Sequence, residues 1–203
     1  KQLSDHFSMP ERTVATVANG TVGLTVSLLS LKAKRGSLCI IPAWTFIASV
    51  HAVIGAGLIP YFIDVDIDSW SLNPEHVLEM ISRAPFDVGA VMVVSPFGRP
   101  LDTEKWDSFT DATGVPVVID AAAGFESLSG VFNTPTVVSM HATKSLGIGE
   151  GGFVISGNKW FIEKIRQASN FGFNLSKNVI MSGTNAKLSE YQAAIGLAAL
   201  KNW

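Results

Sequence analysis

Short apolar runs alternate along this chain with segments in which apolar residues recur every three or four positions. The short runs are typical of strands buried on both faces of a sheet, and the spaced pattern is typical of amphipathic helices. The predicted strands cover residues 38–41, 59–63, 89–94, 115–119, 137–140 and 152–156. The predicted helices cover residues 21–34, 43–54, 74–82, 103–113, 159–170 and 188–203. This alternation predicts a three-layer α/β/α fold, with helices on both faces of a mostly parallel sheet.

Residues 36–63 contain no charged side chain, and this stretch is longer than the ~20 residues that a membrane-spanning helix needs. Pro42, Gly55, Gly57 and Pro60 interrupt it and divide it into a strand, a helix and a strand. Such a division is typical of elements that are buried on both faces of a parallel sheet. We therefore predict sheet elements here and no membrane span.

The first long predicted helix begins at a turn of small residues. Residues 1–12 are polar and weakly patterned, and residues 14–17 are a short apolar approach to Asn19-Gly20-Thr21. A small-residue turn that opens a helix presents free N–H groups and a hydroxyl, which together can bind an anion. The alternative is a simple N-cap by Asn19 or Thr21. Basic residues end the predicted helix, where they would oppose its dipole: Lys32, Lys34 and Arg35.

Asp120 directly follows the apolar run Val-Pro-Val-Val-Ile, at the carboxyl end of a predicted strand. Ligands of parallel sheets collect beyond this end of the strands. A buried carboxylate is costly unless it is paired, so a partner is implied. The alternative is that Asp120 caps the Ala-Ala-Ala-Gly segment that follows it.

The loop between the last two predicted strands carries Lys144. A partly desolvated lysine amine can form a Schiff base with an aldehyde such as that of pyridoxal phosphate. Such a site also needs an acid for the pyridine nitrogen, donors for the phosphate and a face for the ring. His141 stands close to Lys144 and is a candidate hydrogen-bonding group near the cofactor. The alternative is an ordinary hairpin with a solvated lysine.

Composition narrows the classes of partner. The chain has 203 residues, and 47% hydrophobic content with 16% charged residues suffices for a sizeable core. A net charge of -2 and a pI near 6.1 give no basic field that would hold nucleic acid, so we expect small-molecule partners. The lone Cys39 suggests a structural thiol in a reducing cytosol, and no Cys or His spacing predicts a metal site. We expect a cytoplasmic protein.

Six sequence elements in order resemble the DegT/StrS family of pyridoxal-phosphate-dependent aminotransferases, and they span nearly the whole chain. They are Asn-Gly-Thr at a helix start, Pro-Ala-Trp-Thr-Phe-Ile-Ala, a strand ending in Asp-Ala-Ala, Ser-Met-His-Ala-Thr-Lys, Glu-Gly-Gly, and Gly-Thr-Asn-Ala-Lys-Leu-Ser-Glu-Tyr-Gln-Ala-Ala. The resemblance implies the large domain of the pyridoxal-phosphate-dependent transferase fold type I. We expect residues 1–203 to form this cofactor-binding domain, truncated at both ends, with the smaller C-terminal domain of the family absent.

The resemblance assigns roles to the two candidate catalytic residues. Lys144 matches the Schiff-base lysine, which also shuttles a proton between the substrate carbon and the cofactor. Asp120 matches the partner of the pyridinium nitrogen. Its negative charge favours the protonated ring, which accepts electrons when the substrate proton departs.

The remaining cofactor-binding residues are also implied by the resemblance. Gly20, Thr21 and Ser139 match donors to the phosphate. Phe46 matches the aromatic residue that covers one face of the ring, and its alternative is a core aromatic on a buried helix. Asn185 matches a residue that reaches the phosphate of the neighbouring subunit, which implies a homodimer.

The sequence also departs from the family pattern. Ala123 stands where His or Gln is usual, three residues after the aspartate, and this removes a polar neighbour of the cofactor. Phe171 replaces a basic residue or His before Gly172, and Lys187 stands where Arg is more frequent.

The reaction implied by the resemblance is amino transfer from an amino acid, here expected to be glutamate, to a nucleotide-linked keto-sugar in polysaccharide or antibiotic-sugar biosynthesis. One alternative is a dehydratase with the same fold and cofactor; Lys144 counts against it, because His replaces the lysine in those relatives. Another is a fragment that binds cofactor or a partner without turnover. A dinucleotide-binding oxidoreductase is disfavoured, because Gly147, Gly149 and Gly152 precede a strand and do not open a helix.

Overall fold

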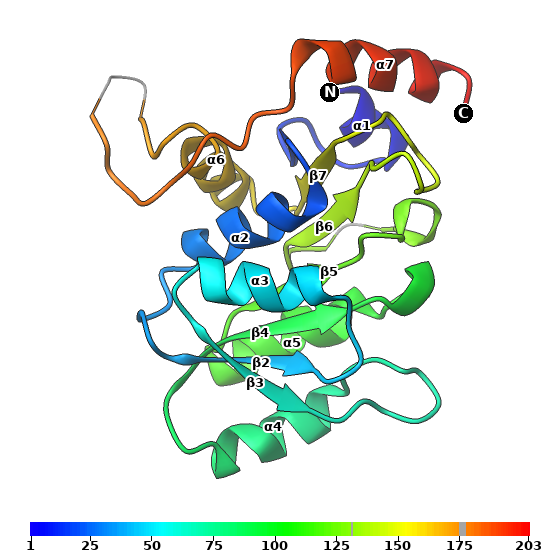
Figure 1. Ribbon diagram of the computed structural model, residues 1–203. Coiled ribbons are helices and arrows are strands. Elements are labelled where there is room, and N and C mark those ends of the chain that lie inside the picture. Colours follow the sequence, from blue (N-terminus) through cyan, green and yellow to red (C-terminus); the bar gives the residue numbers. More distant parts are fainter. Residues whose placement is uncertain (131, 175–177) are drawn as a thin grey trace.

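The computed structural model describes residues 1–130, 132–174 and 178–203, in which one seven-stranded sheet lies between two layers of helices (Figure 1). The strands lie in the order β1-β7-β6-β5-β4-β2-β3. Their bounds are β1 Val14–Val17, β2 Leu38–Pro42, β3 Ile59–Ile63, β4 Val88–Val94, β5 Val117–Asp120, β6 Thr136–Ser139 and β7 Gly152–Ile155. Strands β3, β2, β4, β5 and β6 pair in parallel, and β7 pairs antiparallel with β6 and β1. This confirms the predicted α/β fold with a mostly parallel sheet.

The helices of the described residues have the following bounds: α1 Gln2–His6, α2 Gly20–Ser30, α3 Ile47–Gly55, α4 Pro74–Arg83, α5 Thr103–Thr113, α6 Lys159–Ala168 and α7 Glu190–Lys201. Short 3-10 turns lie at Pro96–Gly98 and Phe125–Ser127. Helices α2, α3 and α6 cover one face of the sheet, and α4 and α5 cover the other (Figure 1). Helix α7 packs near α1 beside the antiparallel end of the sheet.

Each face of the sheet has its own apolar core. Along β4, Val91 and Val93 belong to the core under α4 and α5, and Ala90 and Met92 belong to the core under α2 and α3. Successive side chains of a strand point to opposite faces, so a strand in the middle of a two-faced sheet must be apolar throughout. Cys39 on β2 is buried in the same way, and burial raises the pKa of its thiol. No helix in the described ranges is long and apolar enough to span a membrane.

Two helix ends differ from the prediction by four residues, and the others agree within two residues. Helix α2 ends at Ser30 and not at residue 34, because Lys32 takes a left-handed backbone conformation (φ 59°) that turns the chain toward β2. Its basic residues therefore lie beyond the helix and do not oppose its dipole. Helix α3 begins at Ile47 and not at residue 43, because the Ala43 N–H still donates to the Ile63 carbonyl, which extends the β2–β3 pairing.

The structure also differs from the prediction in the uncharged stretch and at the N-terminus. Strand β3 is an edge strand and is not buried on both faces: Phe62 is 51% exposed. Residues 1–12, predicted to be weakly patterned, contain α1, which buries Leu3, and Phe7 directly after it stacks edge-on against Phe125. The apolar approach at residues 14–17 is strand β1. These contacts are tertiary, so local periodicity could not predict them.

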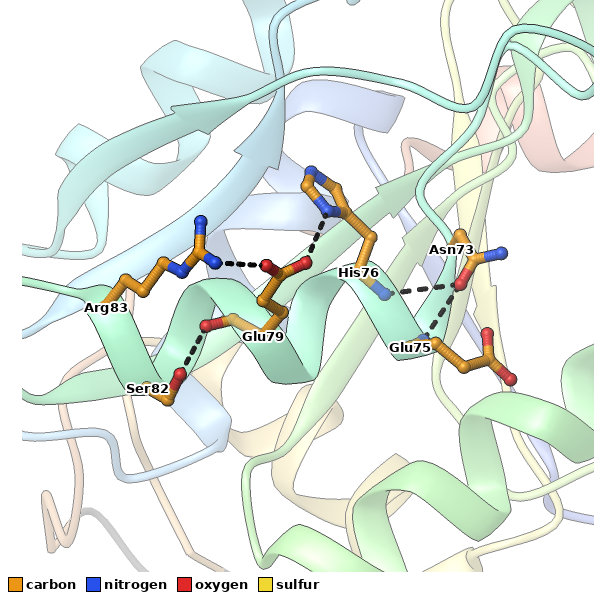
Figure 2. Close-up of polar contacts among 6 residues, drawn as sticks. All are labelled: Asn73, Glu75, His76, Glu79, Ser82 and Arg83. Carbon is orange, nitrogen blue, oxygen red and sulfur yellow. Dashed lines mark hydrogen bonds and ion pairs between the residues drawn. The ribbon is translucent and has the colours of Figure 1, made fainter.

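Helix α4 shows the local signals that made most helix boundaries predictable (Figure 2). Asn73 Oδ1 accepts the N–H groups of Glu75 (2.9 Å) and His76 (3.3 Å), and Pro74 opens the helix. One turn further on, the Glu79 carboxylate pairs with Arg83 and lies 3.7 Å from His76 Nδ1. All of these contacts are exposed and fix the helix locally.

Candidate active site

The Asp120 carboxylate ends β5 at the carboxyl edge of the sheet and is 6% exposed. Its Oδ2 accepts a hydrogen bond from Ser49 Oγ (2.7 Å), and its Oδ1 accepts one from the Ala122 N–H (3.1 Å). The sequence offered a partner and a cap of the next segment as alternatives, and the carboxylate has one contact of each kind. Ser49 comes from α3, 71 positions away in the chain, and no local pattern pointed to it.

The electrostatics of Asp120 are dominated by its burial. Burial raises the pKa of this carboxyl group, because water is excluded from its charged form. The Ser49 hydroxyl, the Ala122 N–H and the positive charge of Lys144 act in the opposite direction. Asp120 and Lys144 therefore lie close enough for their charges to interact.

Lys144 lies on the connection between the antiparallel strands β6 and β7, so the hairpin interpretation of this loop is correct for its topology. The loop is closed by backbone hydrogen bonds from Ala142 to Gly149 (2.8 Å) and from Lys144 to His141 (2.8 Å). Leu146 is buried beneath it. The lysine side chain is half-buried, as a reactive amine beside a ligand would be.

His141 braces this loop. Its Nδ1 accepts the Thr143 N–H (3.2 Å) and lies 2.8 Å from Thr143 Oγ1. Because Nδ1 must accept the backbone proton, the ring proton of neutral His141 is assigned to Nε2, which faces the Glu150 carboxylate at 3.6 Å. The contacts of His141 with Thr143 and Glu150 are therefore all made within the loop itself.

The start of α2 lies against the carboxyl end of β6. Asn19 caps the helix by accepting the Val22 N–H (2.8 Å), which confirms the N-cap interpretation for Asn19 and not for Thr21. A Cβ atom on Gly20 would lie 3.2 Å from the Cβ of Ser139, so glycine permits this close approach. The first N–H groups of any helix have no partner within it, and here they belong to residues beside the Ser139 hydroxyl. Gly20, Thr21 and Ser139 are therefore brought together.

Phe46 stands at the N-terminal boundary of α3 and is 77% exposed, so the alternative of a core aromatic is wrong. The Ser49 N–H donates to the Phe46 carbonyl (3.1 Å), which links the position of Phe46 to the residue that binds Asp120. The side chain is available to a ligand at the carboxyl edge of the sheet.

Asn185 is exposed and pairs through its backbone with Asn170, beyond the end of α6. Its Oδ1 accepts a hydrogen bond from the ammonium group of Lys187 (2.6 Å). The two amide N–H groups remain as the donors of this side chain. Lys187 also lies 4.9 Å from the centre of the Phe171 ring. The two departures from the family pattern at residues 171 and 187 are thus in contact. Among the residues described, no set of His, Cys, Asp and Glu is arranged to hold a metal ion.

Comparison with known proteins gives a consistent result. The model of the DegT/DnrJ/EryC1/StrS aminotransferase family matches residues 2–203. The dTDP-4-amino-4,6-dideoxy-D-glucose transaminase of Shigella dysenteriae is 32% identical over 189 residues, which cover 91% of this chain and 50% of that protein. The chain spans about half the length of the first curated relatives that it matches.

Solved structures are similar over the same region. The structure of a putative pyridoxal-phosphate-dependent aminotransferase from Bacillus cereus has a TM-score of 0.87 and 39% identity, and it covers 94% of this chain and 53% of that chain. The structure of DesI in the presence of its TDP-sugar product has a TM-score of 0.84 and 31% identity, with 98% and 50% of the two chains covered.

Proposed function

The chain belongs to the DegT/DnrJ/EryC1/StrS aminotransferase family, and on this premise we propose that it contributes to pyridoxal-phosphate-dependent transfer of an amino group to a nucleotide-linked keto-sugar. The observation that carries the proposal is the buried Asp120 carboxylate at the end of β5, held there by hydrogen bonds from Ser49 and Ala122. The nucleotide-sugar class is supported by the name of the Shigella relative and by the TDP-sugar product of DesI.

The residues present fit pyridoxal phosphate by their chemistry. The buried carboxylate of Asp120 suits a pyridine nitrogen, and the half-buried amine of Lys144 suits an aldehyde. The helix start at Gly20 suits a phosphate, and the exposed ring of Phe46 suits the flat face of the cofactor. When bound, this cofactor supplies a carbonyl that joins a lysine amine and a ring that accepts electrons from the substrate carbon.

The protein's own groups then have distinct tasks. Lys144 Nζ would hold the cofactor and move a proton at the substrate carbon. The Asp120 carboxylate would keep the ring nitrogen protonated, because an adjacent negative charge favours the cationic ring. The hydrogen bonds of Ser49 and Ala122 orient this carboxylate for that task.

The start of α2 would hold the phosphate. The N–H groups of Gly20 and Thr21 and the hydroxyl of Ser139 would donate to it, and the helix dipole favours a negative charge there. Phe46 would cover one face of the ring and exclude water from it.

A second copy of the chain completes the phosphate site. In this homodimer, the amide N–H groups of Asn185 from one protomer donate to the phosphate bound by its partner. The Lys187 contact supports this arrangement, because it occupies the amide oxygen and leaves the amide donors free to point toward an anion. Glutamate is the amino donor in the proposed reaction.

Borohydride reduction tests the central residue. The protein is incubated with pyridoxal phosphate and reduced, and the labelled peptide is located by mass spectrometry, with Lys144→Ala as the control. We expect the label on Lys144 and its loss in the variant. A label on another lysine, or none in a folded protein, would overturn the assignment.

A panel of nucleotide-linked keto-sugars with glutamate tests the substrate class. Formation of 2-oxoglutarate that depends on a nucleotide-linked keto-sugar supports the proposal. Turnover with simple keto acids alone would contradict the sugar acceptor and leave the cofactor assignment standing.

A further inference from the structure

Ser49 uses its hydroxyl differently from the buried serines of α2. Ser27 and Ser30 donate to carbonyls one turn earlier in their own helix, at 2.8 and 2.7 Å, which is the usual arrangement for a helical serine. Ser49 is fully buried on α3, yet its hydroxyl donates across to the Asp120 carboxylate at 2.7 Å. Its hydrogen bond therefore links a helix to the end of a strand and does not serve the helix itself.

The direction of the hydrogen bonds follows from the carboxylate. An ionised carboxylate only accepts, so the Ser49 proton lies toward Asp120. Thr45 Oγ1 is 2.7 Å from Ser49 Oγ, and with the Ser49 proton already engaged, Thr45 is the donor of this pair. The Phe46 carbonyl, at 3.3 Å from Thr45 Oγ1, is the more distant acceptor for the same proton. The result is a chain of two hydroxyls that runs from Thr45, just before α3, through Ser49 on α3 to Asp120 at the end of β5.

No residue next to Asp120 can replace this hydroxyl. Ala121, Ala122 and Ala123 follow it and have no side-chain donors. In the part of the chain that the structure describes, Ser49 is the side chain that hydrogen-bonds to the carboxylate. Hydrogen bonds to a charged buried group are among the stronger ones, and losing one leaves an oxygen of the carboxylate unpaired.

We propose that Ser49, oriented by Thr45, is a positioning residue for amino transfer, whose hydroxyl fixes the Asp120 carboxylate and keeps it ionised for the ring nitrogen. The inference rests on the proposed function. Because the Ser49 N–H also donates to the Phe46 carbonyl, the same turn of α3 fixes the aromatic residue and the carboxylate relative to each other. Burial of Asp120 favours its neutral form, and Ser49 is the largest of the contributions that oppose this.

The first test measures Asp120 without cofactor or turnover. The carboxyl carbons of the protein are labelled with ¹³C, the Asp120 signal is assigned by its loss in Asp120→Asn, and its titration is followed by NMR. Ser49→Ala should raise the pKa of Asp120, and Thr45→Val should move it in the same direction. Ser30→Ala, which removes a buried hydroxyl bonded to its own helix, is the matched control and should leave the titration unchanged.

The second test separates positioning from packing in the active protein. Ser49→Ala and Ser49→Cys should both lower kcat about tenfold with little change in KM for the amino donor, because cysteine fills the space but is a weak donor. Ser30→Ala should keep the wild-type kcat. Full activity in Ser49→Cys would overturn the inference, since it would show that volume and not the hydrogen bond matters.

The two failures can be told apart. If Asp120 titrates in folded Ser49→Ala as it does in the wild type, the inference fails, whatever the borohydride experiment shows. If Lys144 is not labelled, the proposed function fails, and the positioning role in amino transfer fails with it.

Discussion

Replacing Asp120 by Asn should make the cofactor-free protein more stable at neutral pH while removing most of its amino-transfer rate. The side chain is 6% exposed, and burial raises the pKa of this carboxyl group despite the opposing effects of Ser49, Ala122 and Lys144. The folded protein therefore binds the Asp120 proton more tightly than the unfolded chain does. As the pH rises, ionisation of this group destabilises the folded state.

The magnitude follows from proton linkage. The stability contributed by this group is fully present below the ordinary pKa of 3.8 and is lost as the pH rises through the higher pKa of the folded state. Each unit of elevation corresponds to about 1.4 kcal/mol. Asparagine has the same shape without the charge, and its amide can accept the Ala122 N–H and donate to Ser49. We therefore expect Asp120→Asn to be more stable than the wild type at pH 7, by an amount that grows with the elevation of the Asp120 pKa on folding.

Urea unfolding of both proteins without cofactor, from pH 7 down to pH 4, measures the difference in unfolding free energy. This difference should be largest at pH 7 and should shrink as the pH falls. Turnover is measured separately and should be mostly lost, because a neutral amide does not favour the cationic ring. A variant that is less stable at pH 7, or a difference that does not change with pH, would refute the reasoning.

Two further predictions concern the phosphate site. Gly20→Ala should weaken pyridoxal phosphate binding roughly tenfold in a spectroscopic titration. The reason is that its Cβ would lie 3.2 Å from the Ser139 Cβ and obstruct a donor to the phosphate. The control is Gly196→Ala on α7, whose Cβ would lie 3.7 Å from its nearest neighbour and which should bind as the wild type does. Asn185→Ala should weaken binding by a similar factor in a protein that light scattering shows to be a dimer; a monomer with unchanged affinity would contradict the cross-subunit contact.

Helix boundaries could be predicted from the sequence where the signals were local. Helix α5 begins after the Asp102 cap and ends at Gly114, which takes a left-handed conformation, and its bounds were predicted correctly. Helix α3 has no such signal, because Phe46 makes no side-chain cap, and its start was misplaced. Lys32 turns the chain in a left-handed conformation, and a lysine in the sequence does not predict such a turn.

The candidate site was predictable in its parts and not in its connections. Asp120 stood out because it directly follows an apolar strand, and Lys144 stood out because it lies in the loop between two apolar strands. The Ser49 contact could not be predicted, since it joins residues 71 positions apart and a serine in an apolar helix carries no local signal. The roles taken from the family resemblance remain predictions that the experiments above address.

The pairing of β5 with β6 has a consequence for the spacing of the proposed site. Asp120 lies opposite Val137, so Ser139 stands one strand over and two residues further along. With strands ~4.8 Å apart and a rise of ~3.3 Å per residue, the two Cα atoms are separated by about 8 Å. Backbone hydrogen bonds, and not side chains, set this span between the acidic residue and the proposed phosphate donor. A slip of one residue would turn Ser139 to the opposite face, so the alignment of these two strands keeps the two groups of the proposed site on one face at a fixed distance.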